Sequence, residues 1–288
     1  MQLIHFHSDD GFRMDGILCL PPSPRAVVVH VHGKCGNFYQ NDFISHMTTK
    51  FPEANIAFLA FNNRGHDCLA EGYFGNRLQY IGGSVELFED SRLDITAALK
   101  FASPLAPKVF LQGHSNGCEK ILYFLSNYSQ SFRQLSGVIL LSPCDSFALQ
   151  QINIAPESID EQVERIEKAY QDNQDATLAD KEYGIQVAGK SYNIPVTARS
   201  YLSLAKGAAF RAVRYSSDRP SYSIPHRTLV CFNDPDPYLT VPIPTAFSLL
   251  KENLLNAEIS VQYGTDHHFH GSEEALISAI VSWSAQND

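Results

Sequence analysis

The sequence has few basic residues for its length. Its 288 residues include 22 lysines and arginines against 31 aspartates and glutamates, which gives a formal net charge of -9. Because affinity for nucleic acids rests largely on clustered lysine and arginine side chains, this balance argues against a DNA- or RNA-binding protein. The hydrophobic content of 44% is high enough for a sizeable buried core, so a disordered chain is excluded as well.

Long apolar segments are also missing. The longest apolar runs, such as Ala26–Val31 and Gly137–Leu141, are far shorter than the roughly 20 residues that a membrane-spanning helix needs. The first residues, Met1–His7, show no basic stretch followed by an apolar stretch and a small-residue cleavage site. We therefore expect a soluble, cytoplasmic protein that does not bind a membrane.

Closely spaced cysteines are absent too. None of the six cysteines forms a C-x-x-C pair, so the sequence favours reduced thiols over a zinc site or a disulfide-stapled domain. Cys35, Cys118 and Cys144 fall near the ends of expected strands and are interpreted as small buried residues. No phosphate-binding loop is present either, and we expect neither a metal nor a cofactor.

Short β-type runs alternate with helical stretches along most of the chain. This alternation is typical of a mostly parallel sheet covered by helices on both faces. The first two runs flank the turn cluster Ser8–Gly11, which predicts an antiparallel hairpin leading into the sheet. The eight expected strands are Gln2–His7, Phe12–Leu20, Ala26–His32, Ile56–Phe61, Lys108–Gln112, Gly137–Leu141, Arg227–Phe232 and Glu258–Tyr263. The expected crossover helices are Asn41–Lys50, Ser84–Phe101, Cys118–Tyr128, Pro244–Asn256 and Ser272–Ser284.

Some 80 residues separate the sixth expected strand from the seventh, far more than an ordinary connection. We therefore divide the chain into a core domain of residues 1–145 and 226–288 and an insertion of residues 146–225. Apolar residues at helical spacing predict helices within Glu157–Lys181 and Thr197–Leu204. Because connections of this length are usually functional, the insertion is interpreted as a helical lid over an active site. The alternative is a surface decoration without function.

A glycine-rich turn supplies the candidate nucleophile. Gly113–Gly117 reads Gly-His-Ser-Asn-Gly and lies directly between an expected strand and an expected helix. In a nucleophile elbow the serine occupies a strained turn, and glycines two positions to either side avoid collisions between the strand and the helix. Ser115 is therefore the candidate nucleophile, with an ordinary glycine-rich turn as the alternative.

A serine hydroxyl needs a base, and the base needs an orienting carboxylate. Asp234 and Asp236 follow the seventh expected strand, and His267, His268 and His270 follow the eighth. Serine, aspartate and histidine at the ends of successive late strands follow the order of an α/β hydrolase. Histidines this close together are also able to share a zinc ion, with His30 and His32 as further ligands, but that interpretation is the weaker one.

On these motifs the sequence resembles the α/β-hydrolase superfamily over nearly its whole length. A further matching segment, His30–Gly36, is similar to the oxyanion-hole segment after the third strand of that fold. The resemblance implies an oxyanion hole made by the backbone N–H groups of Lys34 and Asn116, and a structural role for the turn Asn62–Gly65. It also implies the α/β-hydrolase fold, an α/β architecture with a mostly parallel eight-stranded sheet, helices on both faces and a helical lid between strands six and seven.

The resemblance also ranks the candidates for the triad. Asp236-Pro-Tyr-Leu fits the strand-end pattern of related hydrolases better than the residues after Asp234 do, and His267 matches their His-x-Phe ending. The expected catalytic residues are therefore Ser115, Asp236 and His267. Asp145, after the sixth expected strand, occupies the position of the acid in some relatives and is the further alternative.

The expected reaction is hydrolysis of a carboxylic ester of a small or medium organic molecule through an acyl-enzyme on Ser115. Alternatives on the same triad are a thioesterase, an acyltransferase or a peptidase, and a different class of function is non-catalytic ligand binding. Three fragments, Gly113–Lys120, Tyr201–Leu204 and Ser216–Asp218, are similar to fungal siderophore esterases, which implies a peptide- or polyketide-derived ester. The small-molecule substrate is the only expected partner, and no oligomeric state is indicated.

Overall fold

The computed structural model of the chain describes residues 1–128, 135–178, 183, 185–187, 190–192, 194–206, 209–216, 221–254 and 256–286. For residues 185–187 and 190–192 the description is of the backbone alone. Several sequence expectations extend beyond these ranges, among them the expected helix Pro244–Asn256 at residue 255. The last residues of Glu157–Lys181 and of Ser216–Asp218 lie outside the described residues.

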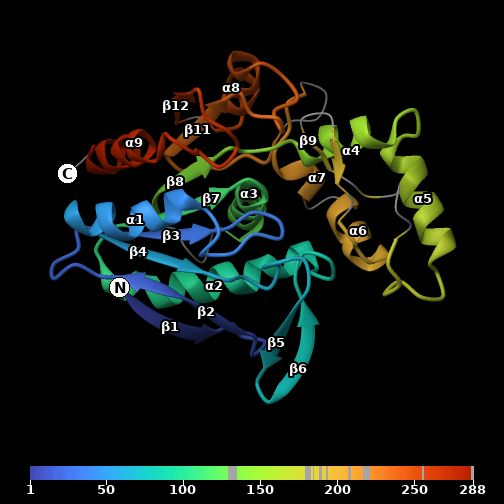
Figure 1. Ribbon diagram of the computed structural model, residues 1–288, viewed down its shortest axis with the longest axis horizontal. Helices are drawn as coiled ribbons and strands as arrows, with labels where there is room; N and C mark the ends of the chain where they lie inside the picture. The colour runs from blue at the N-terminus through green and yellow to red at the C-terminus, as the bar shows by residue number, and fades with distance from the viewer. Residues whose placement is uncertain are drawn as a thin grey trace.

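An eight-stranded sheet runs through the centre of the molecule (Figure 1). Its strand order is β1-β2-β4-β3-β7-β8-β11-β12. β2 is antiparallel to both of its neighbours. The remaining neighbours in this order, from β4 through β3, β7, β8 and β11 to β12, are parallel to one another. The expected mostly parallel sheet with an antiparallel hairpin at one edge is confirmed. The strands are β1 (Gln2–His7), β2 (Arg13–Cys19), β3 (Ala26–Val31), β4 (Ile56–Phe61), β7 (Val109–His114), β8 (Leu135–Leu141), β11 (Thr228–Asp234) and β12 (Ala257–Tyr263).

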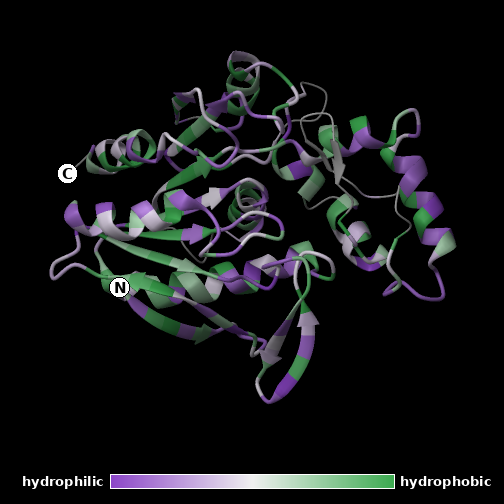
Figure 2. Ribbon diagram, in the orientation of Figure 1, coloured by the Kyte–Doolittle hydropathy of each residue, from purple (hydrophilic) through white to green (hydrophobic). Residues whose placement is uncertain are grey.

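Helices cover both faces of this sheet, because the central strands are apolar on both faces, as β3 shows. Its side chains alternate between the faces, so Val27 and Val29 belong to one hydrophobic core and Val28 to the other. All three are fully buried, which explains why such central strands read as continuous apolar runs (Figure 2). Helices α2, α3 and α8 contribute to the first core, and α1 and α9 contribute to the second. These helices are α1 (Asp42–Glu53), α2 (Ser91–Ala102), α3 (Asn116–Tyr128), α8 (Ile243–Lys251) and α9 (Glu273–Ala285).

One expected helix is shorter than its sequence pattern predicts. The pattern starts at Ser84, but α2 begins at Ser91 after a 3-10 turn at Phe88–Asp90. Gly82 has a φ of +113°, and its carbonyl accepts the backbone N–H of Glu86 at 2.9 Å. The chain therefore turns tightly here before the helix starts.

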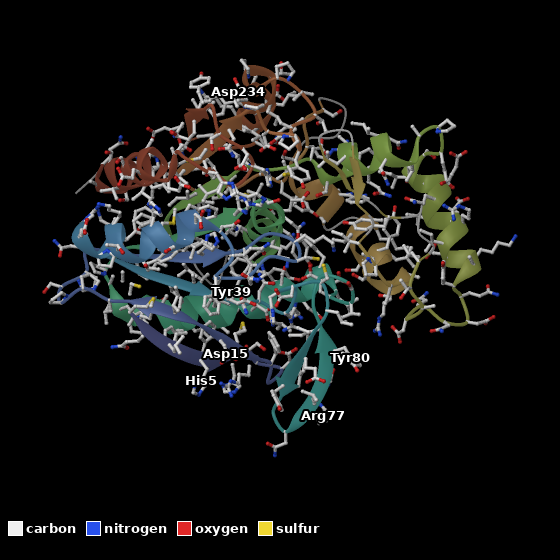
Figure 3. The ribbon with its side chains drawn as sticks, in the orientation of Figure 1. His5, Asp15, Tyr39, Arg77, Tyr80 and Asp234 are labelled. Carbon is white, nitrogen blue, oxygen red and sulfur yellow. The ribbon has the colours of Figure 1, made fainter. Side chains whose placement is uncertain are left out.

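A hairpin that projects from the body of the molecule was not expected (Figure 1). It consists of β5 (Ala70–Phe74) and β6 (Arg77–Ile81). β6 buries only Ile81, and Tyr80 is 71% exposed. β6 alternates polar and apolar residues, but Leu78 is 49% exposed as well, so this short alternation does not mark a half-buried strand. Figure 3 shows Arg77 and Tyr80 at the outside of the molecule.

The turn Asn62–Gly65 after β4 borders two buried ion pairs. Arg64 pairs with the unexposed Asp94 at 2.8 Å. Lys120 pairs with Glu86 at 2.7 Å, and neither of these side chains is exposed. Nζ of Lys120 also donates a hydrogen bond to the turn. These contacts fit the structural role that the resemblance implies for the turn.

The insertion between β8 and β11 contains more than helices. Its described elements are α4 (Ser146–Ile154), α5 (Ile159–Ala169), β9 (Ile185–Val187), β10 (Lys190–Tyr192), α6 (Ala198–Ala205) and α7 (Ala209–Ala212). They gather at one end of the sheet (Figure 1), and α5, α6 and α7 contribute Ile166, Tyr201 and Phe210 to a common hydrophobic cluster. The expected helices within Glu157–Lys181 and Thr197–Leu204 are present as α5 and α6, and β9 and β10 add an antiparallel hairpin that was not expected. Its action as a lid stays a prediction.

In the described part of the chain, no helix combines the length and the apolar character that crossing a bilayer requires.

Three histidines are buried at the centre of the molecule. Nδ1 of His30 lies 2.8 Å from Nε2 of Gln112, and Nε2 of His32 accepts the backbone N–H of Asn63 at 3.1 Å. His114 is equally enclosed. Burial lowers the pKa of His30 to about 3 and holds the pKa values of His32 and His114 well below the ordinary value. All three are therefore neutral in the folded protein near neutral pH.

We expect His30 to make the fold sensitive to acid. The pKa of His30 is depressed in the folded chain. Below about pH 6.5 its imidazole therefore binds a proton in the unfolded chain but stays neutral in the folded chain. The stability of the wild type relative to His30→Gln should fall by up to about 1.4 kcal/mol per pH unit as the pH drops below that value. Urea unfolding of both proteins between pH 7 and pH 4 measures this difference. Parallel pH dependences in the two proteins would contradict it.

Candidate active site

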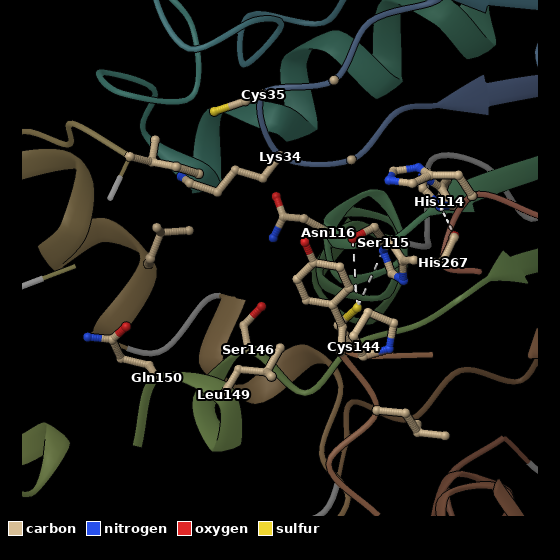
Figure 4. Close-up of a pocket in the computed structure, with 18 of the residues that line it drawn as sticks. Lys34, Cys35, His114, Ser115, Asn116, Cys144, Ser146, Leu149, Gln150 and His267 are labelled. Atoms are coloured by element: carbon tan, nitrogen blue, oxygen red, sulfur yellow. Dashed lines mark hydrogen bonds between the residues drawn. The ribbon is translucent and has the colours of Figure 1, made fainter. Parts of the chain in front are cut away.

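Ser115 lies in a sharp turn between β7 and α3, as the sequence pattern predicts. Its φ is +54°, a value that side-chain-bearing residues rarely adopt. The turn is held by a hydrogen bond from the Ser115 backbone N–H to the carbonyl of Leu141 on β8, at 2.9 Å. This strained backbone presents the serine side chain to a cavity at the end of the sheet (Figure 4).

The two glycines of the turn are required by close packing. A Cβ at Gly113 would lie 2.6 Å from backbone atoms of Gly117. A Cβ at Gly117 would lie 2.2 Å from the carbonyl oxygen of Val31 on β3. Both distances are far below van der Waals contact, and backbone atoms cannot move aside without disturbing the sheet. The physical reason for the Gly-x-Ser-x-Gly spacing is therefore met in this chain.

Gly117→Ala should destabilise the protein by about 3 kcal/mol or more, because the new methyl group collides with the backbone of a central strand. Gly75→Ala is the matched control. Gly75 has a φ of +59°, which Gly117 in α3 does not share, but a Cβ at Gly75 meets nothing within 4 Å. Its cost should stay near 1 kcal/mol. Chemical denaturation compares the two variants, and equal losses would show that packing at Gly117 is not decisive.

His267 and Asp236 form a hydrogen-bonded pair beside this turn. Nδ1–H of His267 donates to both carboxylate oxygens of Asp236, at 2.8 Å and 3.0 Å. Each side chain is only 5% exposed. Asp236 is held in turn by the backbone N–H of Tyr238 at 2.9 Å. The loops after β11 and β12 thus bring together the aspartate and the histidine that the sequence singled out.

The two other candidate carboxylates lie elsewhere. Asp234 is exposed at the end of β11, and Figure 3 places it at the periphery of the molecule. Asp145 caps α4 by accepting the backbone N–H of Ala148 at 2.9 Å, and it also accepts the N–H of Tyr215 at 2.7 Å. Neither side chain contacts His267 among the described contacts.

The neighbouring histidines of the same loop differ from His267 in their surroundings. His268 borders the cavity, and burial lowers its pKa to about 4. His270 is exposed and bonded to Asp266 at 2.7 Å, which raises its pKa. His114 bonds the backbone carbonyl of His267 through Nε2 at 2.9 Å and so helps to position the loop.

Cys144 borders the cavity, as its place after an expected strand predicts, but its position between Ser115 and His267 was not expected (Figure 4). Its Sγ is 3.7 Å from Oγ of Ser115 and 4.0 Å from Nε2 of His267. The thiol also donates to the carbonyl of Ser142 at 3.3 Å. Among the described contacts no hydrogen bond joins Ser115 directly to His267, and catalytic hydrogen bonds often tighten only when substrate is bound. Burial, followed by the nearby Asp236 charge, raises the pKa of the Cys144 thiol, so it is protonated at neutral pH.

The segment expected to form the oxyanion hole lies against the serine. A Cβ at Gly33 would sit 3.0 Å from Cβ of Ser115, so the loop that carries Lys34 packs on the nucleophile. Asn116, the first residue of α3, borders the same cavity. The Asn116 side chain donates to Glu119, a buried residue that the sequence analysis missed. Burial raises the pKa of Glu119 to about 8, and the hydroxyl of Ser146 donates to it at 2.8 Å.

The cavity in front of Ser115 has a volume of about 530 Å³, a size that suits a small organic molecule. The core contributes Lys34, Asn116, Cys144, Tyr238, His267 and His268 to its walls. The insertion contributes the apolar side chains Leu149, Ile152, Ile194, Leu204 and Phe210 together with Ser146, Gln150 and Tyr183. One wall of the cavity is therefore built by the insertion.

Known structures share this architecture. A carboxyl esterase from Bacillus coagulans is 17% identical to the chain, with a TM-score of 0.66 and coverage of 98% of this chain and 97% of that one. The α/β hydrolase GrgF from Penicillium sp. sh18 is 14% identical, with a TM-score of 0.66 and the same coverage. DcsB in complex with its substrate analogue is 13% identical, with a TM-score of 0.67 over 99% of this chain and 98% of that one. At these identities the likeness shows the fold.

Sequence comparison gives the family. A search of curated proteins finds no match to the chain. The family model described as serine aminopeptidase, S33, matches residues 22–175, more than half of the sequence. This range includes the segment around Lys34 and the elbow at Ser115. The chain therefore belongs to the serine aminopeptidase S33 family of α/β hydrolases.

Proposed function

We propose that the protein hydrolyses carboxylic esters of small or medium organic molecules through an acyl-enzyme on Ser115. The observation that carries this proposal is the buried His267–Asp236 hydrogen bond beside a serine on a strained elbow, with Ser115 and His267 both bordering one cavity. The carboxyl esterase from Bacillus coagulans among the similar structures supports the choice of an ester.

The chemistry follows from the placement of these groups. Nε2 of His267 takes the hydroxyl proton of Ser115 while Oγ attacks the ester carbonyl, and Asp236 keeps the Nδ1 proton in place. The backbone N–H groups of Lys34 and Asn116 stabilise the negative charge that develops on the carbonyl oxygen. His267 then gives the proton to the leaving alcohol. In the second half of the reaction His267 takes a proton from water, which attacks the acyl-enzyme, and then returns it to the Ser115 oxygen as the acid leaves.

The insertion has a part in this proposal. Its apolar side chains close one side of the cavity, and this burial favours an organic acyl or alcohol group over water. We infer that residues 146–225 act as the lid of the site. Figure 2 shows that the outer helix α5 is largely hydrophilic, which does not favour a lipase acting at an oil surface.

An aminopeptidase activity, which the family description names, fits the cavity less well. A substrate with a free amino terminus carries an ammonium group that needs a carboxylate partner when buried. Within the described part of the chain, no aspartate or glutamate borders the cavity. The ammonium of Lys34 would instead repel the substrate.

A series of p-nitrophenyl esters with increasing acyl length tests the proposal. We expect release of p-nitrophenol with a chain-length optimum set by the cavity, and loss of activity after labelling with a fluorophosphonate. Added alcohols and amines distinguish hydrolysis from acyl transfer by the products formed. No release together with no labelling would overturn the proposal in favour of a non-catalytic ligand-binding protein.

A further inference from the structure

Lys34 places a positive charge at the wall of the cavity. Among the residues that border the cavity in the described part of the chain, Lys34 is the only lysine or arginine, and no aspartate or glutamate borders it. The whole protein, in contrast, is acidic, with a net charge of -9. The charge of the cavity is thus opposite to that of the molecule.

The ammonium of Lys34 forms no direct ion pair in the described structure. Nζ donates to the carbonyl of Gly83 at 2.9 Å and lies 5.5 Å from the centre of the Tyr183 ring. The buried carboxylate of Glu86 pairs directly with Lys120 at 2.7 Å, and the Lys34 ammonium acts on it only through its charge, which helps to lower the pKa of Glu86. A lysine ammonium has three donors, so the described contacts leave two of them unused. A half-buried cation in this state gains from an anion that brings its own acceptors.

The position of Lys34 relates this cation to the reacting centre. Its backbone N–H is one of the two proposed oxyanion donors, so the ammonium stands one lysine side chain away from the reacting carbonyl. Figure 4 shows the side chain extending from its loop toward the insertion. The part of the wall that the insertion builds includes Leu149, Leu204 and Phe210, which suit an apolar substrate body.

We propose that the cavity selects esters that carry a carboxylate in their acid or alcohol part, and that the Lys34 ammonium binds this group. The inference rests on the proposed function, because it names the substrate class of the same site. Tyr183 and the carbonyl of Gly83 position the ammonium, and the apolar wall contacts the uncharged part of the substrate.

Matched ester pairs test the selectivity. For a charge in the acid part, we compare kcat/KM for 4-nitrophenyl hydrogen glutarate with that for 4-nitrophenyl pentanoate. For a charge in the alcohol part, we compare 4-acetoxybenzoate with 4-acetoxybenzamide. In at least one pair the wild type should prefer the anion by about 10-fold or more, and Lys34→Met should lose this preference. Lys34→Arg, which keeps the charge, should retain most of it.

The ratio within a pair separates substrate selection from damage to the oxyanion loop, since such damage slows both esters alike. The inference is overturned if neither pair favours the anion, or if Lys34→Met keeps the wild-type ratio. A high salt concentration should reduce the preference, because it screens the ammonium.

A binding measurement keeps the inference independent of turnover. Octanoate serves as the anionic probe and octanamide as its neutral control, with calorimetry on Ser115→Ala and on the same protein with Lys34→Met. Octanoate should bind about 10-fold more weakly to the double variant, while octanamide should not. Equal octanoate binding would overturn the inference even in an active esterase. Lys34-dependent binding in a protein without esterase activity would support the anion site and reject only the proposed reaction.

Discussion

Replacing Ser115 with alanine should lower kcat/KM for ester hydrolysis by at least about 1,000-fold while leaving the fold intact. The substitution removes the attacking oxygen and nothing larger. The described contact of Oγ is only a long one, 3.7 Å to the thiol of Cys144, so little stability depends on it. The p-nitrophenyl ester assay and a denaturation curve measure the two effects side by side.

Cys144 makes a control necessary, because its sulfur lies 4.0 Å from Nε2 of His267. A thiol in this place is a conceivable second nucleophile. Burial raises its pKa, however, and only the thiolate reacts well, so Cys144 should not replace Ser115. Cys144→Ala should therefore still be labelled by a fluorophosphonate, whereas Ser115→Ala should not. Activity near the wild-type rate in Ser115→Ala would end the proposed mechanism, and its loss in the Ser115→Ala, Cys144→Ala double variant would assign it to the thiol.

The main features of the fold could be predicted because they are local in the sequence. Fully buried parallel strands such as Ala26–Val31 are continuous apolar runs, and the helices between them have periodic apolar faces. The elbow is equally local, since Gly113–Gly117 must fit between one strand and the helix that follows. The hairpin of β5 and β6 escaped prediction because most of its side chains are exposed and carry no burial pattern.

The surroundings of the site depend on contacts between distant segments. Cys144 follows Ser115 by 29 residues, and Tyr183, whose ring lies 5.5 Å from Nζ of Lys34, is in another segment altogether. No spacing rule within one sequence indicates that such residues meet. The choice between Asp234 and Asp236 was different, because both follow one strand, and there a strand-end pattern was enough to favour the residue that the structure places against His267.

That choice of carboxylate leads to the second large effect. Asp236→Asn should lower kcat by about 10,000-fold with little change in KM. The Asp236 carboxylate accepts Nδ1–H of His267 at 2.8 Å, which leaves Nε2 free to accept the serine proton. An amide in its place is able to donate a hydrogen bond to Nδ1, which favours the tautomer with a proton on Nε2, and that tautomer cannot act as the base. It also fails to stabilise the imidazolium that forms during attack.

Asp234→Asn is the matched control for this prediction. Asp234 stands two residues away on the same strand end but is exposed. Its substitution should change kcat by no more than about two-fold, because an exposed charge that does not contact His267 is well screened. Asp145→Asn should lower stability rather than the chemical step, since it removes the carboxylate charge that faces the buried Arg214 at 3.5 Å. A larger loss of kcat in Asp234→Asn or Asp145→Asn than in Asp236→Asn would mean that the described His267–Asp236 bond does not orient the base, and that the loop after β12 rearranges when substrate binds.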